Sequence, residues 1–173
     1  MPRKSAETVF AVTTVLSLAA VAAAAALLPD RVPTHFGASG AADDWSTRAG
    51  AVTFLALFTA GVAAMFAGLV RWTGRLPLAW INVPEKHRWV DAGREPELRR
   101  RLREDLLLFG AGVNLLALAV TAAVVQAARS DSGGLPGWWF VVFGAWLLVT
   151  ITHAVLVGAV RYRLDPADGG PGR

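Results

Sequence analysis

Apolar residues are gathered into four long stretches along the chain, and none of the stretches contains a charged side chain. They cover residues 8–28, 51–70, 106–128 and 138–160, with lengths of 21, 20, 23 and 23 residues. An α-helix rises about 1.5 Å per residue, so each stretch is long enough to cross a hydrocarbon core about 30 Å thick. Because backbone groups cannot remain unpaired in lipid, and the alternation of a barrel strand is absent, the pattern predicts four transmembrane helices.

This pattern defines the expected fold class, an all-α integral membrane protein with one four-helix domain over residues 1–164. Residues 165–173 are rich in Gly, Pro and Asp and predict a disordered tail. The first stretch follows Arg3 and Lys4, as a signal peptide would. Its apolar run exceeds the roughly 7–15 residues of such a segment, which favours a retained helix.

The placement of basic residues predicts the orientation of the helices. Hydrophobic residues make up 54% of the chain and charged residues 17%, against about 25% charged in a typical soluble domain. Of the 17 Lys and Arg residues, 14 lie in the two terminal segments and the connection 71–105, and three lie in the other two connections. Lys and Arg concentrate on the cytoplasmic side, so both termini and the middle connection are expected inside the bacterial cytoplasmic membrane.

Aromatic residues near the ends of the apolar stretches agree with this arrangement. Trp138 and Trp139 begin the fourth stretch, and Trp72 and Tyr162 follow the second and fourth stretches. Aromatic rings with a polar edge favour the membrane interfaces, so Tyr162 is expected at the inner one.

Small residues recur on one face of the second stretch, at Ala56, Ala60, Ala64 and Gly68. Small residues at this spacing let another helix approach closely. The pattern is typical of packing inside a helical bundle, and the alternative is the interface of a homo-oligomer.

The outer connection, residues 29–50, is longer than a helix hairpin requires and carries the candidate ligand-binding residues. These are His35, Phe36, Asp43, Asp44 and Trp45. Imidazole and carboxylate groups bind divalent metals, but their spacing here matches no dedicated metal motif. In the alternative interpretation, the His and Phe side chains pack the loop onto the membrane face, and one of the two carboxylates caps a turn before the Trp.

The inner connection carries the candidate partner-docking residues. They are Asn82, Lys86, Arg99, Arg100, Arg101 and Arg103. Pro96 suits the first turn of a helix, so the basic cluster is expected on an inner extension of the third transmembrane helix. The cluster either anchors the chain against anionic lipid or docks a soluble cytoplasmic partner. Direct binding of nucleic acid is not expected, because the cluster lies against the bilayer.

Besides Ser and Thr, the apolar stretches contain three residues with polar side chains that can donate or accept hydrogen bonds between helices, namely Asn114, Gln126 and His153. Such residues either join neighbouring helices by hydrogen bonds or line a transport path. His153 is the only titratable group among them, and its neutral imidazole is expected to hydrogen-bond a neighbouring helix at Asn114 or Thr121. A proton-coupled carrier normally uses a carboxyl group within the membrane, and the four stretches contain none.

Two motifs carry a resemblance to a known family. The first is Leu28-Pro29-Asp30-x-Val32-Pro33-x-His35-Phe36, followed by Gly40, Asp44 and Trp45. The second is Asn82-Val83-Pro84-x-Lys86, followed by Trp89. Together they resemble a bacterial membrane domain of unknown function that occurs in proteins similar to the Sdp toxin-immunity and signalling membrane protein. The resemblance covers roughly residues 8–128. It implies protection against a secreted toxic peptide and a cytoplasmic regulator held at the membrane.

Three functions therefore follow from the sequence as hypotheses. The first is a membrane binding and signalling protein whose outer loop meets an extracytoplasmic peptide and whose inner loop contacts a cytoplasmic regulator. The second is a small transporter or channel subunit, and the third is a metal-dependent enzyme at the outer face. Hydrolase, metalloprotease and phosphate-binding motifs are missing, and the chain has no Cys, so neither catalysis nor a cofactor is expected.

Overall fold

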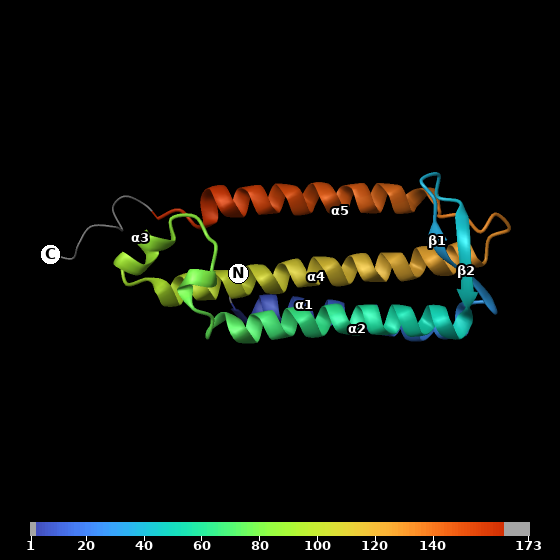
Figure 1. Cartoon of the computed structure of the whole chain (residues 1–173), viewed down its shortest axis with the longest axis horizontal. Coiled ribbons are helices and arrows are strands. Elements are labelled where there is room, and N and C mark those ends of the chain that lie inside the picture. The colour runs from blue at the N-terminus through green and yellow to red at the C-terminus, as the bar shows by residue number, and fades with distance from the viewer. Residues whose placement is uncertain (1–2, 165–173) are drawn as a thin grey trace.

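The computed structural model describes residues 3–164 and consists mainly of four long helices that run side by side (Figure 1). They are α1 (Arg3–Leu27), α2 (Arg48–Thr73), α4 (Glu95–Ala128) and α5 (Gly137–Leu156). All four are long and apolar enough to cross a membrane, which confirms the predicted helical spans. The expected disordered tail, residues 165–173, lies outside the described residues.

Each helix begins before its uncharged stretch, and a local signal marks two of these starts. Thr47 caps the start of α2, and its hydroxyl accepts a hydrogen bond from the Gly50 N–H at 3.1 Å. Helix α4 begins at Glu95 with Pro96 in its first turn, as the sequence predicted. Proline suits this position because its missing N–H would have no partner inside the helix. The arginines of the basic cluster, Arg99, Arg100, Arg101 and Arg103, therefore lie on the N-terminal extension of α4, before its apolar stretch.

The outer connection forms an antiparallel β-hairpin, which corrects the expectation of an all-α fold. Strand β1 (Arg31–Phe36) pairs with β2 (Ala42–Thr47), and the register is irregular after Pro33. Gly40 has a positive φ of 80° in the turn, a conformation that glycine adopts without strain. The strands could not be recognised in the sequence for two reasons. Each has only six residues, and the connection is rich in turn-forming residues and contains Pro33.

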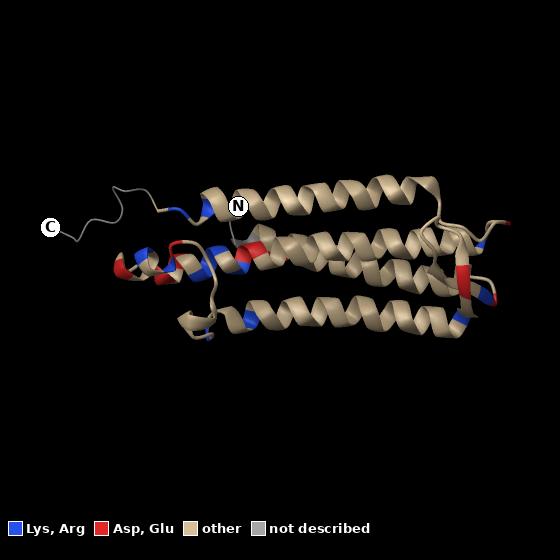
Figure 2. Ribbon diagram, turned by 45° about the horizontal axis from the view of Figure 1, so that its top comes forward, with Lys and Arg blue, Asp and Glu red and all other residues tan. Residues whose placement is uncertain are grey.

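The inner end of the molecule is built from shorter segments. They are the 3₁₀ helix η1 (Leu78–Trp80), helix α3 (Lys86–Asp91) and the π-helical segment η2 (Val157–Arg161), which continues α5. In the part of the chain that the structure describes, Lys, Arg, Asp and Glu side chains concentrate at the two ends of the bundle (Figure 2). The central part of the helices is free of them, as a hydrocarbon layer requires.

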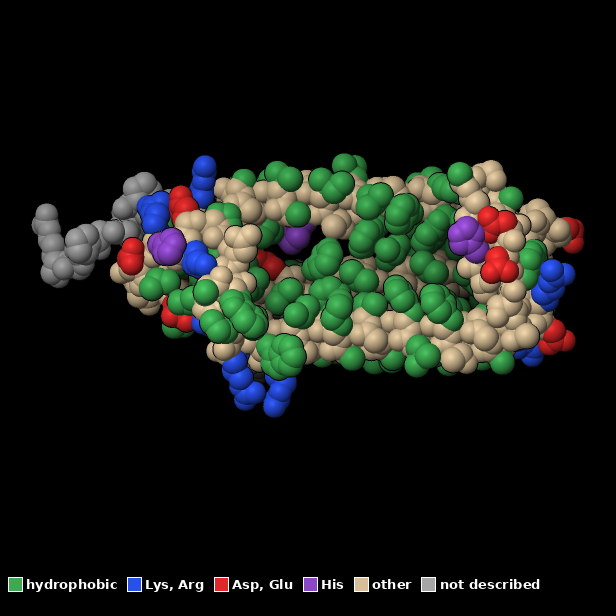
Figure 3. Space-filling view, in the orientation of Figure 1, with side chains coloured by type: hydrophobic (Ala, Val, Ile, Leu, Met, Phe, Trp, Pro, Cys, Tyr) green, Lys and Arg blue, Asp and Glu red, His purple; other side chains and the backbone are tan. Residues whose placement is uncertain are grey.

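The helices are packed unequally. Helix α4 lies along both α1 and α2, and these three form the core of the bundle. A close approach lies at Gly110, where an added methyl group would lie 2.8 Å from Cγ of Phe66. Among the long helices, α5 packs mainly on α4, with Trp146 Nε1 donating a hydrogen bond to the Gly112 carbonyl at 2.9 Å, and no α5 residue is buried. A hollow therefore remains between α5 and α2 (Figure 3).

The small residues of α2 lie on a partly open face. Ala60 and Ala64 are exposed, and Ala56 and Gly68 are half-buried. A methyl group added at Gly68 would meet no neighbouring atom. The homo-oligomer interface stays a prediction for this face.

Candidate functional site

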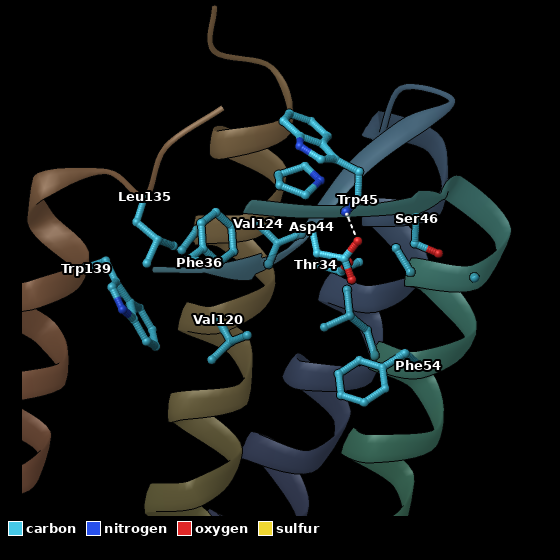
Figure 4. A pocket seen from close by; sticks show the side chains of 15 residues that line it. Thr34, Phe36, Asp44, Trp45, Ser46, Phe54, Val120, Val124, Leu135 and Trp139 are labelled. Atoms are coloured by element: carbon cyan, nitrogen blue, oxygen red, sulfur yellow. Dashed lines mark hydrogen bonds between the residues drawn. The ribbon is translucent and has the colours of Figure 1, made fainter. Parts of the chain in front are cut away.

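A cavity of about 490 Å³ lies beneath the hairpin at the outer end of the bundle (Figure 4). The hairpin forms its roof, α2 and α4 form its walls, and Leu135 and Trp139 close the side next to α5. We call this cavity the outer pocket. Its full lining is Pro33, Thr34, Phe36, Asp44, Trp45, Ser46, Gly50, Ala51, Phe54, Leu55, Val120, Ala123, Val124, Leu135 and Trp139.

The base of the hairpin is fixed to the helices by an apolar cluster. Val32 is fully buried against Ala24, Leu28 and Ala51. Beside it, the Arg48 N–H donates to the Asp30 carbonyl at 3.0 Å, and the Arg48 guanidinium pairs with the Asp30 carboxylate at 2.7 Å. Burying a valine side chain contributes about 1.5–3 kcal/mol, so the roof is an integral part of the fold.

The tip of the hairpin is fixed to the connection between α4 and α5. The Leu135 N–H donates a hydrogen bond to the Gly40 carbonyl at 2.8 Å. Gly133, with φ of 62°, lies so close to Trp45 that an added methyl group would be 2.7 Å from the indole Cη2. Two glycines therefore permit the contacts that hold the roof over the pocket.

Asp44 supplies the one charged side chain in the lining of the outer pocket. Its Oδ1 accepts a hydrogen bond from the Trp45 N–H at 2.8 Å, and Figure 4 shows the carboxylate turned into the cavity. Thr34 and Ser46 are the other polar side chains of the lining, and the remainder is mainly apolar and aromatic. The pocket therefore combines one carboxylate with a large apolar surface.

His35 and Asp43 form a separate pair on the exposed surface of the hairpin. His35 Nδ1 lies 2.5 Å from Asp43 Oδ1, and the two side chains are 70% and 51% exposed. Neither residue lines the outer pocket. Among residues 3–164, no group of three or more His, Asp or Glu side chains is placed to hold a metal ion. Of the residue types that bind metals, the hairpin therefore brings together only His35 and Asp43.

The five outer-loop candidates thus divide into two groups. Phe36, Asp44 and Trp45 line the pocket, whereas the His–Asp pair does not. The contributions of Phe54 and Trp139 were not predicted, since their places in apolar helices gave no sign that they face a cavity. The adjacent tryptophans at the start of α5 were the only available signal.

At the inner end, the candidate docking arginines of α4 are held by contacts within the chain. Arg99 donates to the Thr73 carbonyl at 2.6 Å, and Arg103 pairs with Glu7 at 3.0 Å. Arg100 pairs with Glu104 at 2.7 Å, and Arg101 pairs with Glu97 at 2.6 Å. Sequence reasoning overlooked the acidic partners Glu7, Glu97, Glu104 and Asp105. The docking role of these arginines stays a prediction.

A cluster of buried apolar and aromatic side chains lies next to these arginines. Trp89 is fully buried beside Leu98, Tyr162 and Leu164, and its Nε1 donates to the Tyr162 carbonyl at 2.9 Å. The Arg101 guanidinium lies 4.9 Å from the centre of the Trp89 ring and also donates to the Arg161 carbonyl. The α3 tryptophan of the second sequence motif therefore fastens the end of α5 to α4.

Tyr162 is buried in this cluster instead of exposed to its surroundings, and its position at the depth of the inner interface stays a prediction. Its hydroxyl donates a hydrogen bond to Asp105 Oδ2 at 2.7 Å. Burial, together with this bond and the nearby charge of Asp105, raises the pKa of the Tyr162 hydroxyl above its ordinary value. The tyrosine fits the interior because the carboxylate satisfies its polar end.

The other inner-loop candidates differ in their exposure. Lys86 donates a hydrogen bond from Nζ to the Leu78 carbonyl at 3.0 Å, which joins α3 to η1. Asn82 is exposed. Within the second motif, Lys86 therefore helps to fix the loop, whereas Asn82 lies at the surface.

The three intramembrane polar residues do not converge on a common path. Asn114 is fully buried, and its Nδ2 donates to Thr14 Oγ1 on α1 at 2.8 Å. Gln126 accepts a hydrogen bond from Trp138 Nε1 at 2.8 Å. His153 is exposed on α5. Asn114 and Gln126 thus join helices, as one of the two interpretations expected.

Comparison with known proteins gives one match. A family model described as a domain of unknown function, DUF1648, matches residues 12–60. No curated protein and no solved structure matches the chain. The matched segment spans most of α1, the hairpin and the first half of α2, and it supplies ten of the fifteen residues that line the outer pocket. The match supports the expected domain of unknown function and names no toxin-immunity protein.

Proposed function

We propose that this chain is a multi-pass binding protein of the bacterial cytoplasmic membrane, and that it holds an extracytoplasmic ligand in the outer pocket. The observation that carries the proposal is the cavity itself, which is roofed by the segment that matches DUF1648. Pockets that bind small ligands are mostly apolar with a few placed polar groups, and this lining has that composition.

The proposed orientation has both termini in the cytoplasm and the hairpin outside. The support is the excess of Lys and Arg in the terminal segments and the connection 71–105. Alkaline phosphatase, which is active only outside the cytoplasmic membrane, tests this when fused after residue 40 or after residue 85. Activity at the first site alone agrees with the orientation, and activity at the second site alone contradicts it.

Binding rather than catalysis suits the chemistry of the pocket. The lining offers the hydroxyls of Thr34 and Ser46 and the carboxylate of Asp44, but no histidine or lysine. Nucleophilic catalysis needs a base within hydrogen-bond reach of its hydroxyl, and within residues 3–164 neither hydroxyl forms a hydrogen bond with the Asp44 carboxylate.

The biological role that we propose is immunity of the Sdp type, in which the chain protects its cell from a secreted toxic peptide. The sequence motifs at Asn82 and around Asp44 support this role. Helix α4 offers a route for relay, since it carries both Val124 in the pocket wall and Glu104 in the inner network. A cytoplasmic regulator would then respond to the conformation of the inner loop.

Survival of peptide-sensitive cells that express the chain tests this role. Val120→Trp fills the outer pocket and is expected to abolish protection against the secreted peptide. Leu115→Trp is the matched control, because Leu115 is exposed on α4 and lies outside the lining. Equal protection by both variants, at equal membrane levels, would contradict a role for the pocket.

Affinity capture of the tagged chain from native membranes identifies what it binds. Co-capture of a secreted peptide or a cytoplasmic regulator, lost in Val120→Trp and kept in Leu115→Trp, would support the proposal. Recovery of only this chain or of other membrane subunits would favour a transport or structural role instead.

A further inference from the structure

The outer pocket is open on the side where α2 and α5 fail to meet. Phe54 and Leu55 of α2 face Trp139 of α5 across the surface of Val120. Because α5 packs on α4 and not on α2, an apolar chain has access to the cavity from between these helices. The lower part of the pocket therefore suits a hydrophobic segment of a ligand.

The upper part of the pocket carries an uncompensated negative charge. None of the fifteen lining residues is Lys, Arg or His. Within residues 3–164, the Asp44 carboxylate forms no ion pair, and its one hydrogen bond comes from the Trp45 N–H. Arg31 is held 5.1 Å from the centre of the Trp45 ring and also has no ion pair with Asp44. Asp44 is exposed to solvent as well as part of the pocket lining, so a cationic group of a ligand has access to its carboxylate and can form a charge-assisted hydrogen bond with it.

Aromatic side chains surround the place that a cation would occupy. Figure 4 shows Phe36 and Trp139 to one side of the Asp44 carboxylate and Phe54 below it, further into the pocket. The faces of aromatic rings attract ammonium and guanidinium groups through the ring quadrupole. One carboxylate with aromatic walls is therefore a favourable setting for an organic cation.

We infer that the outer pocket binds a hydrophobic peptide through a basic side chain, with the ammonium or guanidinium group at Asp44 and the flanking apolar residues between α2 and α5. This inference rests on the proposed binding function of the pocket. A phospholipid amine is a poorer fit, since its phosphate would lie close to Asp44 and the lining offers no cation to receive it. A peptide cation brings no such negative charge.

Binding of two matched peptides to the full chain in phosphatidylcholine nanodiscs tests the inference. One is the acetylated and amidated pentapeptide Leu-Phe-Lys-Leu-Phe, and the other has norleucine in place of lysine. With empty nanodiscs as the baseline, isothermal titration should show saturable binding of the lysine peptide about tenfold tighter than its neutral counterpart, equivalent to about 1.4 kcal/mol.

Variants of the two neighbouring aspartates identify the group responsible. Asp44→Asn should remove the preference for the lysine peptide, and Asp44→Glu should keep it. Asp43→Asn is the matched control, because it removes the same charge from the same strand outside the pocket. An equal loss in both Asn variants would overturn the assignment to Asp44, since it would reflect only the general charge of the hairpin.

The remaining outcomes separate the inference from the proposed function. Equal, saturable binding of both peptides would overturn the requirement for a cation and leave the pocket as a binding site. No saturable binding of either peptide would overturn both proposals. Loss of peptide binding when phosphatidylethanolamine replaces phosphatidylcholine would assign the pocket to a lipid amine. It would overturn the inference that the pocket binds a peptide.

Discussion

Asp43 and Asp44 are neighbours in β2, yet their carboxylates serve different surfaces of the hairpin. The first lies 2.5 Å from His35 on the exposed side, and the second lines the outer pocket. Successive side chains of a strand point to opposite faces, which accounts for the division. The sequence alone treats the two aspartates as equivalent, and the fold places only Asp44 in the lining of the outer pocket.

The exposed His–Asp pair should therefore be dispensable for binding. His35→Ala is expected to lower the free energy of unfolding by less than about 1 kcal/mol, because solvent screens a pair that is more than half exposed. Binding of the lysine peptide should stay within about twofold of the wild-type affinity. Isothermal titration of His35→Ala beside Asp44→Ala measures the difference, and a comparable loss in both would place the pair in the binding site.

The roof of the pocket should be sensitive to a single methyl group at Gly133. Gly133→Ala forces a side chain onto a residue with φ of 62° and brings its methyl group 2.7 Å from Trp45. Positive φ and overpacking each cost about 1–2 kcal/mol. We expect a lower midpoint in thermal unfolding and weaker peptide binding. Gly137→Ala, whose methyl group would meet no neighbouring atom, should leave both unchanged.

Two glycines in the middle of transmembrane helices should respond in opposite ways to alanine. Gly110 lies at the contact of α4 with Phe66 and Phe10, where a methyl group would approach to 2.8 and 2.9 Å, whereas Gly144 of α5 faces open space. Gly110→Ala should destabilise the chain by about 1–3 kcal/mol. Gly144→Ala should stabilise it slightly, since alanine is the better helix former. Thermal unfolding in detergent compares them, and equal effects would contradict the packing of α4.

The sequence predicted the features that depend on a local pattern of residues. It did not predict contacts between elements that are distant in the sequence. Uncharged runs gave the four helices, and Pro96 gave the start of α4, because both signals lie within one segment. The partner of each inner arginine could not be predicted in the same way. Glu104 is almost fully buried between Arg100 and Arg161, and this arrangement requires α5 to end beside α4.

The same reasoning explains the outer end. Turn-forming residues identified the connection 29–50 as unusual, but they gave neither the pairing of β1 with β2 nor the face of each aspartate. Alternation places Asp43 and Asp44 on opposite faces, but the irregular register after Pro33 prevents the sequence from showing which of the two faces the pocket. Phe54 and Trp139 complete the lining from helices that are far apart in sequence.

The fastening of α5 at the inner end should weaken in alkaline solution because of Tyr162. Its hydroxyl is buried and donates to Asp105, which raises its pKa in the folded chain above the ordinary value of about 10. A group whose pKa is raised on folding contributes stability below its unfolded pKa and loses it as the pH rises towards the folded pKa. Thermal unfolding midpoints should therefore fall more steeply between about pH 9 and pH 11 in wild type than in Tyr162→Phe.

The thermal unfolding midpoint of Tyr162→Phe at neutral pH provides the baseline for this comparison. At neutral pH this variant loses only the hydrogen bond to Asp105, which is worth about 1–3 kcal/mol because the acceptor is charged. Trp72→Phe is a suitable control, since Trp72 is exposed at the same end of the molecule and should leave the alkaline slope unchanged. Identical alkaline slopes in wild type and Tyr162→Phe would show that the tyrosine hydroxyl is accessible to solvent, and that α5 is not fastened to α4 through it.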